Sequence, residues 1–353
     1  MNWRSLRGRQ RQREMFQRSI QRGRLASAYL FIGPEGVGKS LFARWLSQCL
    51  LCERRADADC DSCGECSSCR QMQSASHPDF LSVGCADGKK EITIGQIAGD
   101  DEKRGREGLC FELSMRPMSS DRRIAIIDGA DLMNDAAANA FLKTLEEPPP
   151  YALLFLIASN PDGLLTTIRS RCQAVHFGPL SSDDVAAILI EKELTTDPDE
   201  ARLVAGLSEG SVSTAAQLLD PRFRQIRERL FTQLSAERFQ SVALAKELAD
   251  AIDDLGGDAA AHRLNAVRLL RFALEFFRMT MSELAGRTAN DRTAVPQVLQ
   301  LIDRHSTDQD RLLLQTMKQF DRCSQAVQQI EIMTPILLSL EAMCDDMSRL
   351  RRP

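Results

Sequence analysis

The sequence GPEGVGKS occupies residues 33–40 and fits the pattern G-x-x-x-x-G-K-[ST] of a phosphate-binding loop. The apolar run AYLFIG (28–33) leads into it, and the helically spaced SLFARWLSQCLLC (40–52) follows. This strand–loop–helix order is the context that such a loop requires. Glycines allow backbone N–H groups to surround phosphates, and here they are Gly33, Gly36 and Gly38. Lys39 would reach the β- and γ-phosphates, and the Ser40 hydroxyl would hold magnesium.

Working outward from the loop, strand and helix patterns alternate. RRIAIIDGA (122–130) and YALLFLIASN (151–160) read as buried strands, and DAAANAFLKTLEEPP (135–149) as a helix that prolines end. Such alternation predicts a parallel sheet with helices on both faces. After Phe177 the pattern becomes almost wholly helical, with breaks at 207–211, 220–223, 253–262 and 286–296. We therefore predict an α/β domain at 1–178, a small helical domain at 179–219 and a larger helical domain at 220–353.

The composition sets further bounds. The chain has 353 residues, a 43% hydrophobic content and a net charge of −4, so it can form two or three domains and carries no overall basic field for nucleic acid. No apolar run is long enough to span a membrane. Eight arginines lie between Arg4 and Arg24; a transit peptide is one reading of them, but an amphipathic first helix explains them better. Its inward face would hold Leu6, Met15, Phe16 and Ile20. We expect a cytoplasmic protein.

A cysteine-rich segment, LLCERRADADCDSCGECSSCR, covers residues 50–70. Four thiolates make a closed tetrahedral zinc site, and thiolates select zinc in a reducing compartment. A structural zinc is therefore expected, the alternative being a free or redox-active cluster. Five cysteines compete for the four positions, namely Cys52, Cys60, Cys63, Cys66 and Cys69. His77, just beyond the segment, is a weaker candidate ligand.

Asp128 ends the strand RRIAIID, where an aspartate can hold magnesium through water. In AAA-type ATPases the next residue is usually a glutamate that polarises the attacking water, but here it is Gly129. Asp131 is a poor substitute, because it lies in the following turn. The alternative reading is an ordinary strand-end aspartate. These residues predict a loop that binds nucleotide beside a strand that is unable to support hydrolysis.

Arg171 lies in TIRSRC (167–172) just before an expected strand. Taken alone, it could cap a helix or reach a phosphate in a neighbouring subunit, and the residues leave both readings open.

Together these motifs resemble the clamp-loader subunits of bacterial DNA polymerase III, over roughly residues 3–220. The most specific parts are SCGECSSCRQMQSASHPDF, DAAANAFLKTLEEPP and TIRSRC. Within that family, HPDF and NDAAANAFLKTLEEPP favour the delta-prime branch over the ATPase motor branch. The departures agree with this choice: Gly129 replaces the glutamate, and Ser213 stands where motor subunits carry a further arginine. Some delta-prime subunits have lost the phosphate loop, whereas this one is intact.

The resemblance implies an AAA+ nucleotide domain with a zinc module at about 52–69, a helical lid domain and a C-terminal collar domain. It implies zinc held by Cys52, Cys63, Cys66 and Cys69, with Cys60 in reserve. Arg171 would enter the ATP site of an adjacent subunit as a finger. The implied partners are the motor and delta subunits, the sliding clamp and, through the complex, primed DNA.

We expect the chain to bind ATP or ADP with magnesium at modest affinity and to hydrolyse almost none of it. As part of DNA polymerase III it would belong to an enzyme complex without being an efficient ATPase itself. Two rival hypotheses are an active motor ATPase of the same family and a P-loop small-molecule kinase. The kinase would need its own acid or base, and the sequence offers no candidate.

Overall fold

The computed structural model describes residues 6–86, 89, 91–100, 104–237, 240–285 and 295–351. Contacts within the chain separate two compact units. One comprises Met1–Ile188 with Gly210–Ser213, and the other Leu189–Glu209 with Thr214–Pro353. The first unit is α/β, and the described part of the second contains only helices. The predicted fold class is confirmed, whereas the division at residues 178 and 219 stays a prediction.

The first unit is built on a five-stranded parallel sheet with the spatial order β2-β3-β4-β1-β5. The strands are β1 (Ala28–Ile32), β2 (Phe80–Val83), β3 (Arg123–Asp128), β4 (Ala152–Ala158) and β5 (Gln173–His176). The sequence located β1, β3 and β4, because central strands of a parallel sheet are buried on both faces and therefore continuously apolar. It did not name β2, and it indicated β5 only as a strand after Arg171; both are four residues long and lie at the two edges.

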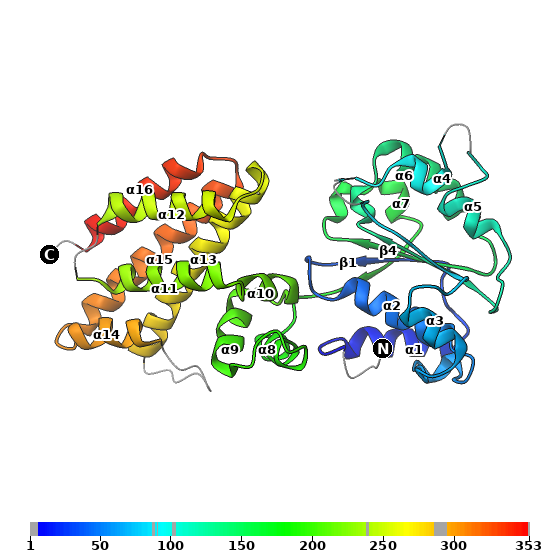
Figure 1. Cartoon of the computed structure of the whole chain (residues 1–353), viewed down its shortest axis with the longest axis horizontal. Coiled ribbons are helices and arrows are strands. Elements are labelled where there is room, and N and C mark those ends of the chain that lie inside the picture. Colours follow the sequence, from blue (N-terminus) through cyan, green and yellow to red (C-terminus); the bar gives the residue numbers. More distant parts are fainter. Residues whose placement is uncertain are drawn as a thin grey trace. The chain divides into compact units, whose positions relative to one another are not determined.

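Helices cover both faces of this sheet (Figure 1). One face carries α1 (Gln10–Gln21), α2 (Lys39–Leu50) and α3 (Ser67–Gln73), and the other carries α4 (Ile94–Ala98), α5 (Leu109–Ser114), α6 (Asp135–Glu146) and α7 (Thr166–Arg169). Alternate strand residues enter two hydrophobic cores, so Phe155 packs on the first face and Leu154 on the second. Phe16 of α1 is fully buried, with its ring centroid 4.8 Å from that of Tyr29. Met15, Phe16 and Ile20 form the predicted inward face of α1, whereas Leu6 joins the same core from the segment before the helix.

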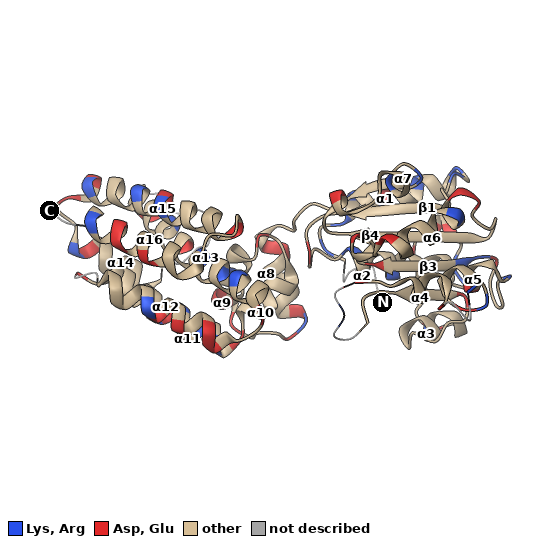
Figure 2. Ribbon diagram, turned by 90° about the horizontal axis from the view of Figure 1, so that it is seen from above, with Lys and Arg blue, Asp and Glu red and all other residues tan. Residues whose placement is uncertain are grey.

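The helical unit begins within α8 (Ser182–Glu191). Its other helices are α9 (Pro198–Leu207), α10 (Val212–Leu218), α11 (Pro221–Ser235), α12 (Ser241–Leu255), α13 (Ala259–Leu284), α14 (Pro296–Arg304), α15 (Gln309–Glu331) and α16 (Ile336–Leu350). Charged residues occur along these helices, whereas β1 and β4 contain none (Figure 2). Three predicted breaks fall between helices, and the fourth, at 286–296, lies mostly outside the described residues. Among the described helices, none is long and apolar enough to cross a membrane.

Candidate nucleotide site and cysteine cluster

The phosphate loop lies at the carboxyl edge of the sheet, where β1 ends at Ile32 and α2 begins at Lys39. Ligands of α/β sheets bind at this edge. Gly33 N donates to Ala158 O at 3.4 Å, which holds the start of the loop against the end of β4. Ser40 lies in the first turn of α2, and Asp128 is the last residue of β3. The fold thus places the sequence-predicted nucleotide residues at one edge.

Lys39 is buried and folded onto its own loop. Its Nζ donates to Gly33 O and Pro34 O, both at 2.7 Å, and to Ser159 Oγ at 3.2 Å. Burial lowers the pKa of Lys39, and three carboxylates oppose this shift, namely those of Asp128, Asp131 and Glu35. The ammonium group already has partners, which a bound phosphate would have to replace. Ser159, at the end of β4, was not named from the sequence because a serine after a strand is a common loop residue.

The segment Gly210–Ser213 contacts the middle of the loop. Val212 N donates to Gly36 O at 3.0 Å. A Cβ placed on Gly36 would lie 2.0 Å from Ser213 Oγ and 2.3 Å from Ser211 Oγ, and the φ of Gly36 is +73°. Only glycine fits this close approach. Ser213 therefore touches the loop, at the position where the family resemblance places the arginine of motor subunits.

Arg9 is a site residue that the sequence did not reveal. It is buried, and its guanidinium donates to Val37 O in the phosphate loop and to Gly178 O, the latter at 2.9 Å. Arg9 therefore ties the loop to the chain just beyond β5. No sequence signal separated it from the other arginines of the N-terminal stretch.

The residue after Asp128 differs structurally as well as chemically from a catalytic glutamate. Gly129 has φ +81° and ψ 44°, and a Cβ there would approach Leu132 Cδ1 to 3.2 Å. Residues with side chains adopt this left-handed conformation only at a cost. Asp131 does not fill the gap, because its Oδ2 accepts from Ser159 N at 3.1 Å and Asn160 N at 2.7 Å. Its carboxylate holds the end of β4.

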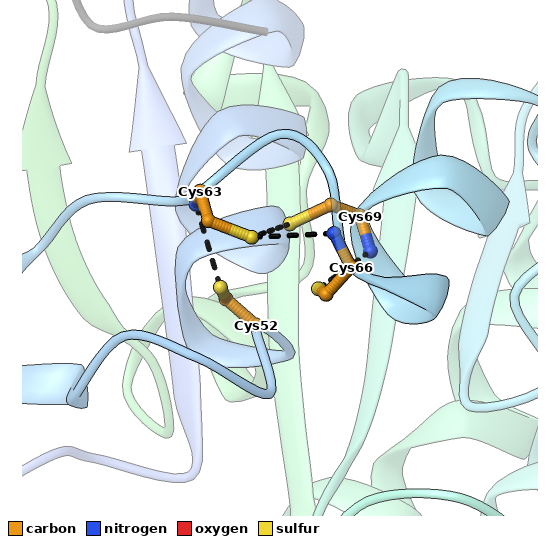
Figure 3. Close-up of side chains that lie close together, drawn as sticks. All are labelled: Cys52, Cys63, Cys66 and Cys69. Carbon is orange, nitrogen blue, oxygen red and sulfur yellow. Dashed lines mark hydrogen bonds between the residues drawn. The ribbon is translucent and has the colours of Figure 1, made fainter.

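Four cysteines converge at the end of α2 and the start of α3 (Figure 3). The Sγ atoms of Cys52, Cys63, Cys66 and Cys69 all lie within 4.8 Å of one another. A tetrahedral zinc with Zn–S bonds of about 2.3 Å requires S···S separations of roughly 3.8 Å. The Cys63 and Cys69 sulfurs are 3.9 Å apart, so the donor set fits this metal.

Backbone N–H groups point at these sulfurs. Cys63 N donates to Cys52 Sγ at 3.4 Å, and Cys66 N donates to Cys63 Sγ at 3.3 Å. Hydrogen bonds from the N–H groups of Glu65 and Cys66 lower the pKa of Cys63 to about 6. These hydrogen bonds favour the thiolate at Cys63, the form that binds metal, whereas burial raises the pKa of Cys69 to about 12.

Cys60 is excluded from the cluster. It is fully buried in the hydrophobic core under α1 and α2, and burial raises the pKa of Cys60 to about 11. His77 is also outside the group of ligand atoms. Its Nε2 is 2.8 Å from Ser68 Oγ, and its Nδ1 accepts from Asp79 N at 3.1 Å. The geometry selects Cys52 over Cys60 and gives His77 a supporting place behind the cluster.

Asp79, in the HPDF stretch, has a structural role that the sequence did not reveal. It is fully buried and accepts five hydrogen bonds from Met118, Ser119 and Ser120, three of them from backbone N–H groups at 2.7–3.0 Å. Burial alone would raise the pKa of Asp79, but these hydrogen bonds outweigh it and the pKa is lowered. The carboxylate thereby fastens the exit of the cysteine segment to the loop before β3.

Arg171 follows α7 and is exposed. Its Nη2 donates to Glu146 Oε1 at 2.7 Å, and its Nη1 donates to Thr167 O at 3.0 Å and lies 3.4 Å from Ser170 Oγ. Glu146 is the last residue of α6. Arg171 is thus accessible to another molecule, with a carboxylate beside it.

Known proteins are similar to this chain in sequence. The family model described as DNA polymerase III, delta subunit matches residues 8–181. A DNA polymerase III subunit delta' from Yersinia pestis is 31% identical over 309 residues, which cover 85% of this chain and 83% of that protein. The chain belongs to the DNA polymerase III delta-prime family. The resemblance to this branch is confirmed.

Other members of the delta-prime and tau branches align over shorter shares. The delta' subunit of Pseudomonas aeruginosa is 35% identical over 199 residues, which cover 56% of this chain and 57% of that subunit. The tau subunit of Salmonella typhimurium is 27% identical over 273 residues, which cover 76% of this chain and 40% of tau. The chain therefore aligns with less than two thirds of these two relatives. Identity is 31–36% to the delta-prime relatives and 27–31% to the tau relatives.

Proposed function

We propose that this delta-prime family member works in the clamp loader of bacterial DNA polymerase III. It would assemble with motor and delta subunits and help to place the sliding clamp on primed DNA. The observation that carries the proposal is the contrast at the sheet edge. An intact phosphate loop lies beside Gly129, whose left-handed backbone disfavours a glutamate. An exposed arginine that could serve another subunit lies elsewhere in the same unit.

In this proposal the chain binds ATP or ADP with magnesium through Lys39, Ser40 and Asp128, and hydrolyses almost none. The phosphate loop supplies backbone N–H groups and a lysine, which support binding. No glutamate follows Asp128, and Ser213 rather than arginine contacts the loop, which supports the lack of hydrolysis.

The cysteine cluster is proposed to hold one structural zinc. Four thiolates fill the coordination sphere, so the metal would cross-link a short segment and offer no position for a substrate. The spacing of the sulfurs and the N–H groups directed at them support this assignment.

Arg171 is proposed to act on ATP held by a neighbouring motor subunit. Phosphoryl transfer spreads negative charge over the γ-phosphate oxygens, and a guanidinium can contact two of them at once. Lysine keeps the charge but lacks this fork. Arg171→Ala should therefore lower the clamp-stimulated ATPase of a loader reconstituted with motor and delta subunits, and Arg171→Lys should restore little.

The loss should be partial, because the other sites of the loader would use their own arginines. Arg169→Ala is a matched control, since Arg169 lies two residues upstream and is paired with Asp162 at 3.2 Å. It should leave the ATPase unchanged. Zinc content and assembly should survive both substitutions. An assembled Arg171→Ala loader with wild-type ATPase and clamp-loading rates would end the finger hypothesis.

The motor hypothesis keeps one supporting observation, the intact phosphate loop at residues 33–40. ATP turnover by the isolated chain decides between the motor hypothesis and the delta-prime proposal. A rate of about one per second, within the range of ordinary enzymes, would favour the motor.

A further inference from the structure

Glu146 is the one acidic side chain paired with Arg171 among the described residues. The two residues are distant in sequence: Glu146 ends α6, and Arg171 follows α7. Both terminal nitrogens of the guanidinium are engaged: Nη2 donates to Glu146 Oε1, and Nη1 donates to Thr167 O. The arginine therefore already makes charge-assisted contacts of the kind that a phosphate would offer.

We propose that Glu146 is a positioning residue that competes with the neighbouring γ-phosphate for Arg171. This inference rests on the proposed finger function. To contact two phosphate oxygens with its fork, Arg171 has to exchange the Glu146 carboxylate for one of them. Glu146 thus keeps the finger withdrawn until a more highly charged acceptor arrives.

The exposure of the pair suits such an exchange. The side chains of Arg171 and Glu146 are 35% and 51% exposed. Ion pairs this exposed are weak, so a phosphate carrying more charge can displace the carboxylate. Glu146 also ends α6, where the negative end of the helix dipole disfavours a carboxylate and favours a cation. Neutralising Glu146 should therefore release Arg171 without unfolding the helix.

The test is Glu146→Gln in the reconstituted loader, with the clamp-stimulated ATPase measured over a range of ATP concentrations. Glutamine keeps the shape and removes the charge. We expect kcat/KM to rise about two- to five-fold, the range of an exposed ion pair. Glu147→Gln is the matched control, because Glu147 is exposed, adjacent, and also loses one charge. It should change neither kcat nor KM.

The double variant Glu146→Gln/Arg171→Ala separates competition from a structural effect. If Glu146 acts through Arg171, the double variant should match Arg171→Ala alone. A Glu146→Gln effect that persists without the arginine overturns the inference, as does a Glu146→Gln loader at or below the wild-type rate. An unchanged rate in Arg171→Ala refutes the finger itself, so the two failures are distinguishable.

Discussion

The cysteine cluster and the phosphate loop lie in the same α/β unit, yet they differ in completeness. The cluster draws four like donors from residues 52–69 and directs backbone N–H groups at them. The phosphate loop has its own glycines, lysine and serine. Beside it, however, lie Gly129 and Ser213, at the two positions where a motor subunit would carry glutamate and arginine. The cysteine cluster contains all the groups that its proposed zinc site needs. The phosphate loop has the groups that bind nucleotide but lacks those that hydrolyse it.

The difference shows that a site has to be judged by its whole set of partners. Lys39 lies on the carbonyls of its own loop, and Arg9 and Val212 hold two further loop carbonyls. The loop is therefore well supported even without nucleotide. The phosphate loop has a structural role that does not depend on ATP hydrolysis, because the same contacts join β1, the end of β4 and the segment Gly210–Ser213.

The largest effect is expected when one cysteine of the cysteine cluster is removed. Cys52→Ser should lose zinc and much of the stability that the metal confers, since apparent binding energies for structural zinc are about 10–16 kcal/mol in small modules. Cys60→Ser should keep its zinc. It should still lose about 1–3 kcal/mol of unfolding free energy, because it places a hydroxyl in an apolar core. Elemental analysis together with thermal unfolding separates the two variants. Zinc lost from Cys60→Ser and kept in Cys52→Ser would reverse the ligand assignment.

A smaller effect should follow from removing the phosphate-loop lysine. Lys39→Ala removes hydrogen bonds from a charged donor, worth about 1.5–3 kcal/mol. ATP or ADP affinity should fall by about one to two orders of magnitude. Titration calorimetry with magnesium nucleotide measures the change. Zinc content should stay at the wild-type level, which makes the variant a control for Cys52→Ser. Equal nucleotide affinity in Lys39→Ala and wild type would contradict a phosphate-binding role.

The smallest effect should come from restoring the missing carboxylate. Gly129→Glu forces a side chain into the left-handed region at a cost of about 1–2 kcal/mol. The free energy of unfolding should fall by that amount, and the isolated chain should gain no ATPase. Gly129→Asn is the matched variant, because asparagine tolerates this conformation better than glutamate does. Its unfolding free energy should lie between that of the wild type and that of Gly129→Glu. Rapid turnover by Gly129→Glu would show that one group alone separates this site from a motor.

Local patterns made much of the fold predictable. A continuous apolar run needs burial on both faces, so β1, β3 and β4 could be located from residue type alone. The loop 33–40 and the CxxC spacing of Cys63, Cys66 and Cys69 are equally local, because neighbouring residues deliver these groups. The short edge strands are less predictable: β2 is not indicated and β5 only as a strand after Arg171, since Ser82 in β2 and Gln173 and His176 in β5 interrupt the apolar pattern.

The sequence by itself determined the fold class, the phosphate loop and the presence of a candidate metal cluster. Only the tertiary structure decided between Cys52 and Cys60, because one thiol reaches the cluster and the other lies in the core. Likewise, only the tertiary structure shows that Asp79 binds the loop at 118–120 and that Glu146 pairs with Arg171. Their partners are distant in sequence, and the contacts exist only after the sheet and its helices have brought separate segments together. Spacing along a chain specifies local geometry, whereas burial and long-range pairing are properties of the folded whole.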